Sequence, residues 1–173
     1  MQITSKFTTA VHILVCIDVF DGQMRVTSDF LSGSTGINPV IIRNVLAQLK
    51  TAGIVSTRKG SGGAHLAKPL SEVTLYDICK ATDAIDGTGL FHFHENPNAA
   101  CPVGRNIHKA MDKKLASVQE AMENELKKTT IAEIAERTRE AIRSERIYTG
   151  RLCLILSYFY TGVLSSKMKN CFF

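Results

Sequence analysis

The apolar residues of the chain recur three or four positions apart in several stretches, and this spacing predicts amphipathic helices with one buried face. One helix is predicted over residues 5–20 and a shorter one over residues 27–35. A third is predicted over residues 38–52, because Asn38 is a good N-cap and Pro39 suits the first helical turn. Only a few residues around a glycine separate the second and third helices, an arrangement typical of a helix-turn-helix.

A β-hairpin is predicted directly after the third helix. Two short apolar pieces, residues 54–55 and 64–66, flank a glycine-rich and basic tip at residues 58–63. A further short helix is predicted over residues 74–83. A helix-turn-helix followed at once by such a hairpin predicts a winged helix, and therefore a fold that is mainly α with a small β component (α+β).

The second half of the chain predicts two more helices and a tail. Residues 84–106 are rich in glycine and proline, so we interpret them as a connecting or sensor loop. A long amphipathic helix follows over residues 107–127, and a capping box at Thr130 and Glu133 begins a last helix. The predicted parts are a winged-helix domain (1–83), the loop (84–106), pairing helices (107–146) and an apolar tail of unknown role (147–173).

The long helix carries a narrow apolar seam, which is typical of a helix that pairs with another helix. Packing against the chain's own helices is the alternative. The seam consists of Ile107, Met111, Leu115, Val118, Met122 and Leu126.

Composition and charge are those of a globular chain with a basic first half. The 173 residues are 45% hydrophobic, and 21 basic against 16 acidic residues give a net charge of +5. Residues 1–80 hold eight basic and five acidic side chains, a net charge of +3, whereas residues 81–150 hold ten and eleven, a net charge of −1. The basic excess therefore lies on the predicted winged helix, as a phosphate-binding face requires.

The cysteines and the two ends of the chain indicate the cellular compartment in which the protein is expected. Five widely spaced cysteines form no CxxC pair, which favours reduced thiols in a cytoplasmic protein. The N-terminus lacks the basic region of a signal peptide. Residues 152–164 form a 13-residue run without charge, which is shorter than the roughly 20 apolar residues of a spanning helix. We expect no membrane partner, although this run leaves attachment to a membrane surface open.

The second helix of a helix-turn-helix enters the major groove of double-stranded DNA, so its first residues are candidate base readers. Arg43 can fork onto guanine and Asn44 onto adenine, or Arg43 contacts phosphate only. Thr27 and Ser28 begin a helix and can donate to phosphate, while Arg58 and Lys59 at the hairpin tip can reach the flanking backbone. The predicted DNA-binding residues are Lys6, Thr27, Ser28, Asn38, Pro39, Val40, Arg43, Asn44, Arg58, Lys59, Ser61, Gly62, Gly63 and His65.

The stretch from Thr27 to Ile78 resembles the Rrf-two family of bacterial winged-helix transcription regulators, the group that includes IscR, NsrR and CymR. The resemblance is carried by Asn38-Pro39-Val40 with Ile42-Arg43, Leu46, Leu49, Ala52-Gly53, Gly60, Gly62-Gly63 and Leu66-Ala67. The segment HENPNAACPVGRNIH is similar to the YwnA-like subgroup, and no counterpart of the tail is identified.

The resemblance implies a homodimer whose long helices cross and hold two winged helices over a pseudo-palindromic operator. Members that bind an iron–sulfur cluster carry three cysteines in the loop before this helix, whereas here that loop holds only Cys101, so no cluster is expected. A thiol sensor at Cys101 is an alternative, and so is a metal site that adds His92, His94 and His108.

We therefore predict a cytoplasmic transcription regulator, more specifically a repressor. A winged helix that binds protein instead of DNA is the alternative. The sequence shows no Ser/His/Asp or paired-carboxylate arrangement, so no enzyme is expected.

Overall fold

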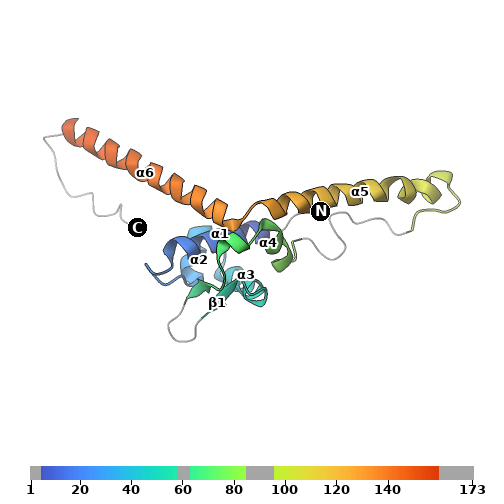
Figure 1. The fold of residues 1–173 in the computed structure, drawn as a ribbon, viewed down its shortest axis with the longest axis horizontal. Helices are drawn as coiled ribbons and strands as arrows, with labels where there is room; N and C mark the ends of the chain where they lie inside the picture. The colour runs from blue at the N-terminus through green and yellow to red at the C-terminus, as the bar shows by residue number, and fades with distance from the viewer. Residues whose placement is uncertain (1–4, 58–62, 85–95, 160–173) are drawn as a thin grey trace. The chain divides into compact units, whose positions relative to one another are not determined.

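The computed structural model describes residues 5–57, 63–84 and 96–159, with side chains up to residue 145. Three helices build the first part: α1 (Ser5–Phe20), α2 (Ser28–Thr35) and α3 (Pro39–Thr51) (Figure 1). These bounds confirm the first three predicted helices to within one residue at each end.

Local capping explains where α2 and α3 begin and end. The Thr27 hydroxyl accepts from the Phe30 N–H at 3.1 Å, and the Asn38 side chain accepts from the Val40 N–H at 2.9 Å. Gly36 ends α2 with φ of 70°, a left-handed conformation that glycine adopts without steric cost. These caps fix the short turn that sets α3 against α2.

A single hydrophobic core joins these helices. Each fully buried aliphatic side chain contributes roughly 1.5–3 kcal/mol to folding. The largest fully buried side chains in α1, α2 and α3 are Ile13, Leu14, Ile17, Leu31, Ile42, Val45 and Leu49.

The predicted hairpin is confirmed as two antiparallel strands, β1 (Val55–Thr57) and β2 (Ala64–Leu66), with Val55 opposite Leu66. We call this hairpin the wing. The Ala64 N–H donates to the Val26 carbonyl at 2.9 Å, which ties the wing to the segment just before α2. Residues 58–62, with the predicted contacts Arg58, Lys59, Ser61 and Gly62, lie outside the described residues.

A 3₁₀ turn, η1 (Leu70–Glu72), precedes α4 (Leu75–Ala81), which ends two residues before the predicted boundary at residue 83. A capping box begins α4: Thr74 accepts from the Asp77 N–H, and the Asp77 carboxylate accepts from the Thr74 N–H at 2.8 Å. The pairing of Thr74 with Thr130 anchors this start of α4 to the beginning of the last helix.

The long helix α5 runs from Pro102 to Lys128 and thus begins earlier than the predicted residue 107. The reason is local: Cys101 is the N-cap and Pro102 occupies the first turn, where a missing N–H costs nothing. The Cys101 N–H donates to the Asn98 carbonyl at 3.1 Å. The predicted loop 84–106 therefore ends at Cys101.

The last helix, α6 (Ile131–Phe159), also differs from its predicted end near residue 146. The sequence pattern placed the end where polar residues give way to an uncharged run, but that run holds no proline and the backbone stays helical. Ile131 and Ala135 belong to the core described above. The chain forms two compact units, Met1–Glu136 and Arg137–Phe173, and no described helix is long and apolar enough to cross a membrane.

Candidate nucleic-acid interface

Helix α3 presents one buried face and one exposed face. Ile42, Val45 and Leu49 are buried in the core, and the opposite side carries Val40, 58% exposed, and the exposed Asn44. Because 3.6 residues make a turn, these exposed positions lie on one outward stripe of the helix. The predicted base-reading residues of the first α3 turns are therefore accessible to a ligand.

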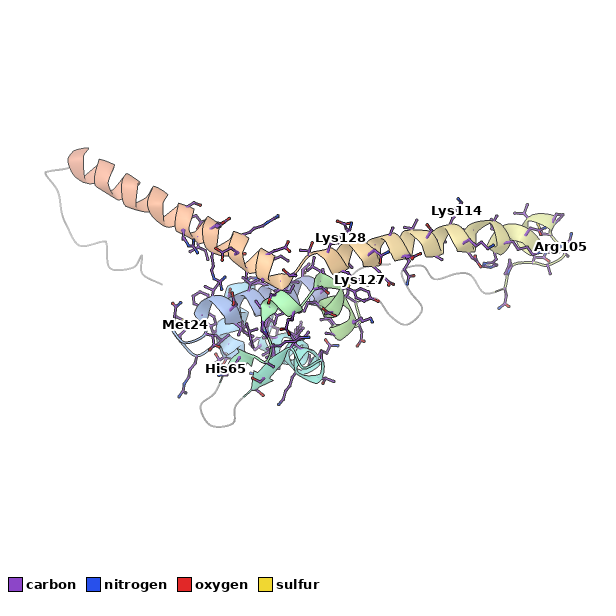
Figure 2. The ribbon with its side chains drawn as sticks, in the orientation of Figure 1. Met24, His65, Arg105, Lys114, Lys127 and Lys128 are labelled. Carbon is purple, nitrogen blue, oxygen red and sulfur yellow. The ribbon has the colours of Figure 1, made fainter. Side chains whose placement is uncertain are left out.

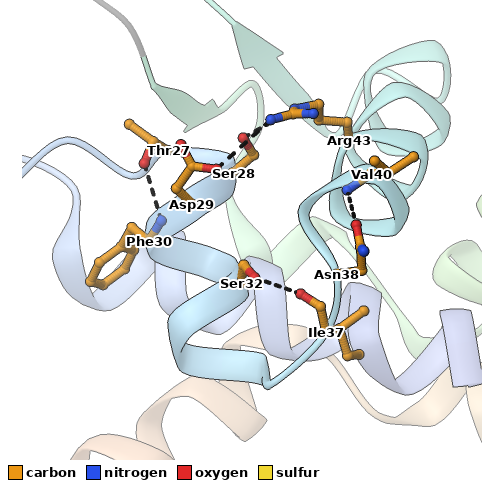
Figure 3. A network of polar contacts seen from close by, with 9 residues as sticks. All are labelled: Thr27, Ser28, Asp29, Phe30, Ser32, Ile37, Asn38, Val40 and Arg43. Atoms are coloured by element: carbon orange, nitrogen blue, oxygen red, sulfur yellow. Dashed lines mark hydrogen bonds and ion pairs between the residues drawn. The ribbon is translucent and has the colours of Figure 1, made fainter.

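Arg43 lies at the edge of this stripe and faces the beginning of α2. Its Nε donates to the Ser28 hydroxyl at 3.3 Å, and its Nη2 lies 3.8 Å from the Asp29 carboxylate (Figure 3). The side chains of Arg43 and Asp29 are 60% and 79% exposed. The start of α2 therefore orients the guanidinium while leaving it open to solvent.

A shallow groove of about 310 Å³ lies between α2, α3 and the wing. Its wall is mostly apolar, and the polar residues among its lining are Thr27, Ser28, Thr57 and Arg43. Hydroxyls, a helix N-terminus and a guanidinium are the donors that bind a DNA phosphate. The groove thus brings together four residues that the sequence predicts as separate contacts, namely Thr27, Ser28, Arg43 and Gly63.

The base of the wing completes this face. Gly63 has φ of 151° and lines the groove beside Ala64. Lys50 Nζ donates to the Thr57 hydroxyl at 3.0 Å and joins α3 to β1. A β-carbon at Gly63 would find ordinary contacts, so it is the backbone conformation that favours glycine there.

Two predicted contacts are positioned differently. His65 Nδ1 lies 2.9 Å from the Asp21 carboxylate, so this ring connects β2 to the end of α1. Lys6 is exposed in the first turn of α1, which contributes no residue to the lining of the groove. Neither residue therefore lines the groove next to Arg43.

The apolar seam of α5 is only partly covered within the first unit. No α5 residue is buried, and Val118 is 53% exposed. The other predicted seam residues, Ile107, Met111, Leu115, Met122 and Leu126, are half-buried. An apolar seam left open on a 27-residue helix is a surface that a second helix can cover.

One end of α5 is fixed to α4 through an aromatic ring. The Tyr76 hydroxyl donates to Glu123 at 3.2 Å, and the ammonium groups of Lys80 and Lys127 lie 4.7 and 4.5 Å from the ring centroid. A hydrogen bond from Gln119 is the main cause that holds the pKa of Glu123 below its usual range, and Tyr76 adds to it. Figure 2 shows Lys127 beside α4, with Arg105 and Lys114 farther along α5.

The three described cysteines have different surroundings. Burial raises the pKa of Cys16 and of Cys79. Cys101 is exposed at the start of α5, where the backbone N–H groups of Gly104 and Val103 lower the pKa of its thiol. Among the residues that the structure describes, no three His, Cys, Asp or Glu side chains gather as metal ligands.

The α1–α4 core with its wing defines a winged helix, the fold of DNA-binding regulators among the solved structures. Residues 3–137 match the model of the Rrf2 (Rrf-two) family, described as an iron-dependent transcriptional regulator, and the chain belongs to this family. This confirms the family resemblance. The family consists of transcription regulators, so the chain is a regulator and not an enzyme.

Individual relatives agree with the family match. One relative is YwnA of Bacillus subtilis (strain 168), which is named as an HTH-type transcriptional regulator. It is 36% identical to this chain over 133 residues, which are 77% of this chain and 96% of YwnA. A crystal structure assigned as a DNA-binding protein is 30% identical, covers 75% of this chain and 97% of its own, and has a TM-score of 0.59. The oxidized form of Staphylococcus aureus CymR, 18% identical over 79% of this chain and 97% of its own, shares the fold with a TM-score of 0.60.

Sequence reasoning missed two residues of this face. Asp29 has the ordinary pattern of an acidic residue in a first helical turn, where it complements the helix dipole. Thr57 has the pattern of a strand residue. Neither signal predicts a contact with α3, because each contact joins residues that only tertiary packing brings together.

Proposed function

We propose that the protein is a transcriptional repressor that binds a pseudo-palindromic operator in double-stranded DNA as a homodimer. One observation carries the proposal: Arg43 is oriented by the start of α2 at the edge of an exposed α3 stripe, next to a groove whose lining includes the hydroxyl residues Thr27 and Ser28. In this arrangement the groove binds a backbone phosphate while Val40, Arg43 and Asn44 face the base edges.

The open seam of α5 supports the homodimer. Two copies of the seam, related by a two-fold axis, cover each other's apolar side chains and hold two winged helices side by side. A two-fold dimer reads two inverted half-sites separated by about one turn of DNA, or 10–10.5 bp. Repression then results from occupation of the operator in the cytoplasm, where bound protein blocks RNA polymerase.

We propose that this activity needs no iron–sulfur cluster. Support comes from the described residues, in which Cys16 and Cys79 are buried and only Cys101 is exposed. Iron analysis and an absorption spectrum of protein purified without oxygen test this proposal. A stoichiometric cluster with its visible absorption bands would overturn it, and it would place ligands among residues that the structure does not describe.

A thiol-responsive regulator is the second candidate, and the surroundings of Cys101 favour it. The residue is exposed, and the N–H groups of Val103 and Gly104 stabilise its thiolate. Oxidant should then change operator affinity in the native protein and leave that of Cys101→Ser unchanged. Equal responses of the two proteins would remove the sensor role.

The repressor proposal is tested by selection of bound genomic fragments with the purified, reduced protein at physiological salt. An enriched inverted repeat is expected. Arg43→Ala should then weaken operator binding by about 1–3 kcal/mol. Lys113→Ala is the control, since it removes a cation from an exposed α5 position outside the groove and should change affinity little. No enriched sequence would instead favour a winged helix that binds protein.

A further inference from the structure

Asp29 presents an electrostatic conflict at the proposed DNA-binding face. It lies in the first turn of α2, beside Ser28 and the groove, and its side chain is 79% exposed. A carboxylate there repels the phosphates that the face is proposed to bind. Because Asp29 opposes phosphate binding at this face, we expect a second role that offsets this cost.

Stabilisation of α2 by its dipole is one such role, but it requires no partner on α3. Asp29 has such a partner, because its Oδ1 lies 3.8 Å from Nη2 of Arg43 (Figure 3). The preceding residue, Ser28, accepts from Nε of the same guanidinium at 3.3 Å. Two consecutive residues of α2 therefore face one edge of a single α3 side chain.

The free part of the guanidinium is defined by this geometry. Arginine has five N–H donors, one on Nε and two on each terminal nitrogen. The Nε donor is bonded to Ser28, and one side of Nη2 faces Asp29. The end of the fork, formed by Nη1 and the other Nη2 donor, is left for a ligand. That end presents two parallel N–H donors, the geometry that a bidentate pair with O6 and N7 of guanine needs.

We propose that Asp29 is a positioning residue that gives Arg43 its specificity for guanine over phosphate. The inference rests on the proposed function. Asp29 and Ser28 hold the Nε edge, so the guanidinium keeps its end-on fork toward the major groove. The Asp29 charge also repels a phosphate that would take the same edge. Without that charge, Arg43 swings onto the DNA backbone and the preference for guanine falls.

The test compares wild type, Asp29→Asn, Arg43→Ala and the double variant. Fluorescence anisotropy measures the affinity of each for two DNAs. One is the selected operator, and the other is the same operator with the G·C pair opposite Arg43 replaced by an A·T pair. An exposed pair changes an equilibrium by up to about fivefold. Asp29→Asn is expected to reduce the ratio of the two affinities about two- to fivefold, mainly by raising affinity for the altered DNA. In the Arg43→Ala background the same change should leave the ratio unaltered.

Glu72→Gln is the matched control, because it removes one exposed negative charge from η1, which does not line the groove. A general charge effect would raise affinity for both DNAs equally, and a purely structural role would lower the melting temperature without changing the ratio. Either result overturns the inference, as does persistence of the Asp29→Asn effect without Arg43, or an Arg43→Ala variant that keeps full discrimination. A wild-type protein without sequence preference would instead overturn the proposed function itself.

Discussion

Val118 gives the sharpest test of the proposed dimer. Val118→Ala removes two carbon groups, worth about 1.6 kcal/mol when fully buried. Val118 is 53% exposed in the single chain, so about 0.8 kcal/mol of that value remains to be gained at an interface. A two-fold dimer contains the change twice, which makes its dissociation about 1.6 kcal/mol more favourable and its dissociation constant roughly 15-fold larger.

The Val118→Ala substitution is not expected to unfold α5. Alanine has a higher helix propensity than valine, so α5 itself should be slightly stabilised. Val103→Ala is the matched control: it makes the same change in the same helix, at a residue that is 68% exposed and lies one turn before the first seam residue, Ile107. Sedimentation and dilution of fluorescently labelled chains measure the dissociation constants. Equal constants for Val118→Ala and wild type, or equal losses for the two variants, would refute the seam as the interface.

Two further predictions concern stability and thiol chemistry. Thr74→Ala removes the hydroxyl that donates to Asp77 at 2.7 Å and accepts from its N–H at 3.2 Å, so it should lower the free energy of unfolding by about 0.5–2 kcal/mol, with Thr74→Ser near wild type. Burial raises the pKa of Asp77, but the Thr74 hydrogen bonds together with the charges of Lys68 and Lys80 outweigh this and keep that pKa below its usual range. The stabilisation is therefore present at neutral pH and lost as pH falls through the folded-state pKa. In thermal unfolding, the difference in melting temperature between Thr74→Ala and wild type should become smaller in acid. A difference that does not change with pH would contradict the role of the carboxylate. Iodoacetamide should alkylate Cys101 before Cys16 and Cys79 in the native protein, as peptide mass spectrometry will show, and equal rates would contradict the lowered pKa of Cys101.

Much of the winged helix could be predicted because its signals are local. Asn38 and Pro39 specify the start of α3 by capping and by a fixed φ, and Gly36 specifies the end of α2. The 3.6-residue spacing of Ile42, Val45 and Leu49 identifies the buried face, and the exposed face follows from it. Exposure of the candidate base readers could thus be predicted without the structure.

The contacts that organise the site could not be predicted in this way. Arg43 meets Asp29 only because the turn sets α3 against the start of α2, and a pairing 14 positions apart leaves no periodic signal. His65 likewise meets Asp21 across 44 positions. The early start of α5 cannot be predicted for a different reason: Cys101 is not a typical N-cap residue, so the sequence pattern assigns Pro102 to the loop.

The measurement that tests the central claim most directly is the salt dependence of operator affinity, for wild type and Arg43→Ala side by side. The account predicts an affinity for the selected operator that falls about a thousandfold or more between 50 and 200 mM salt, as phosphate contacts of both half-sites require. It also predicts that Arg43→Ala loses most of the preference for operator over altered DNA. A flat salt profile, or an Arg43→Ala variant with the affinity and preference of wild type, would contradict DNA recognition by this face.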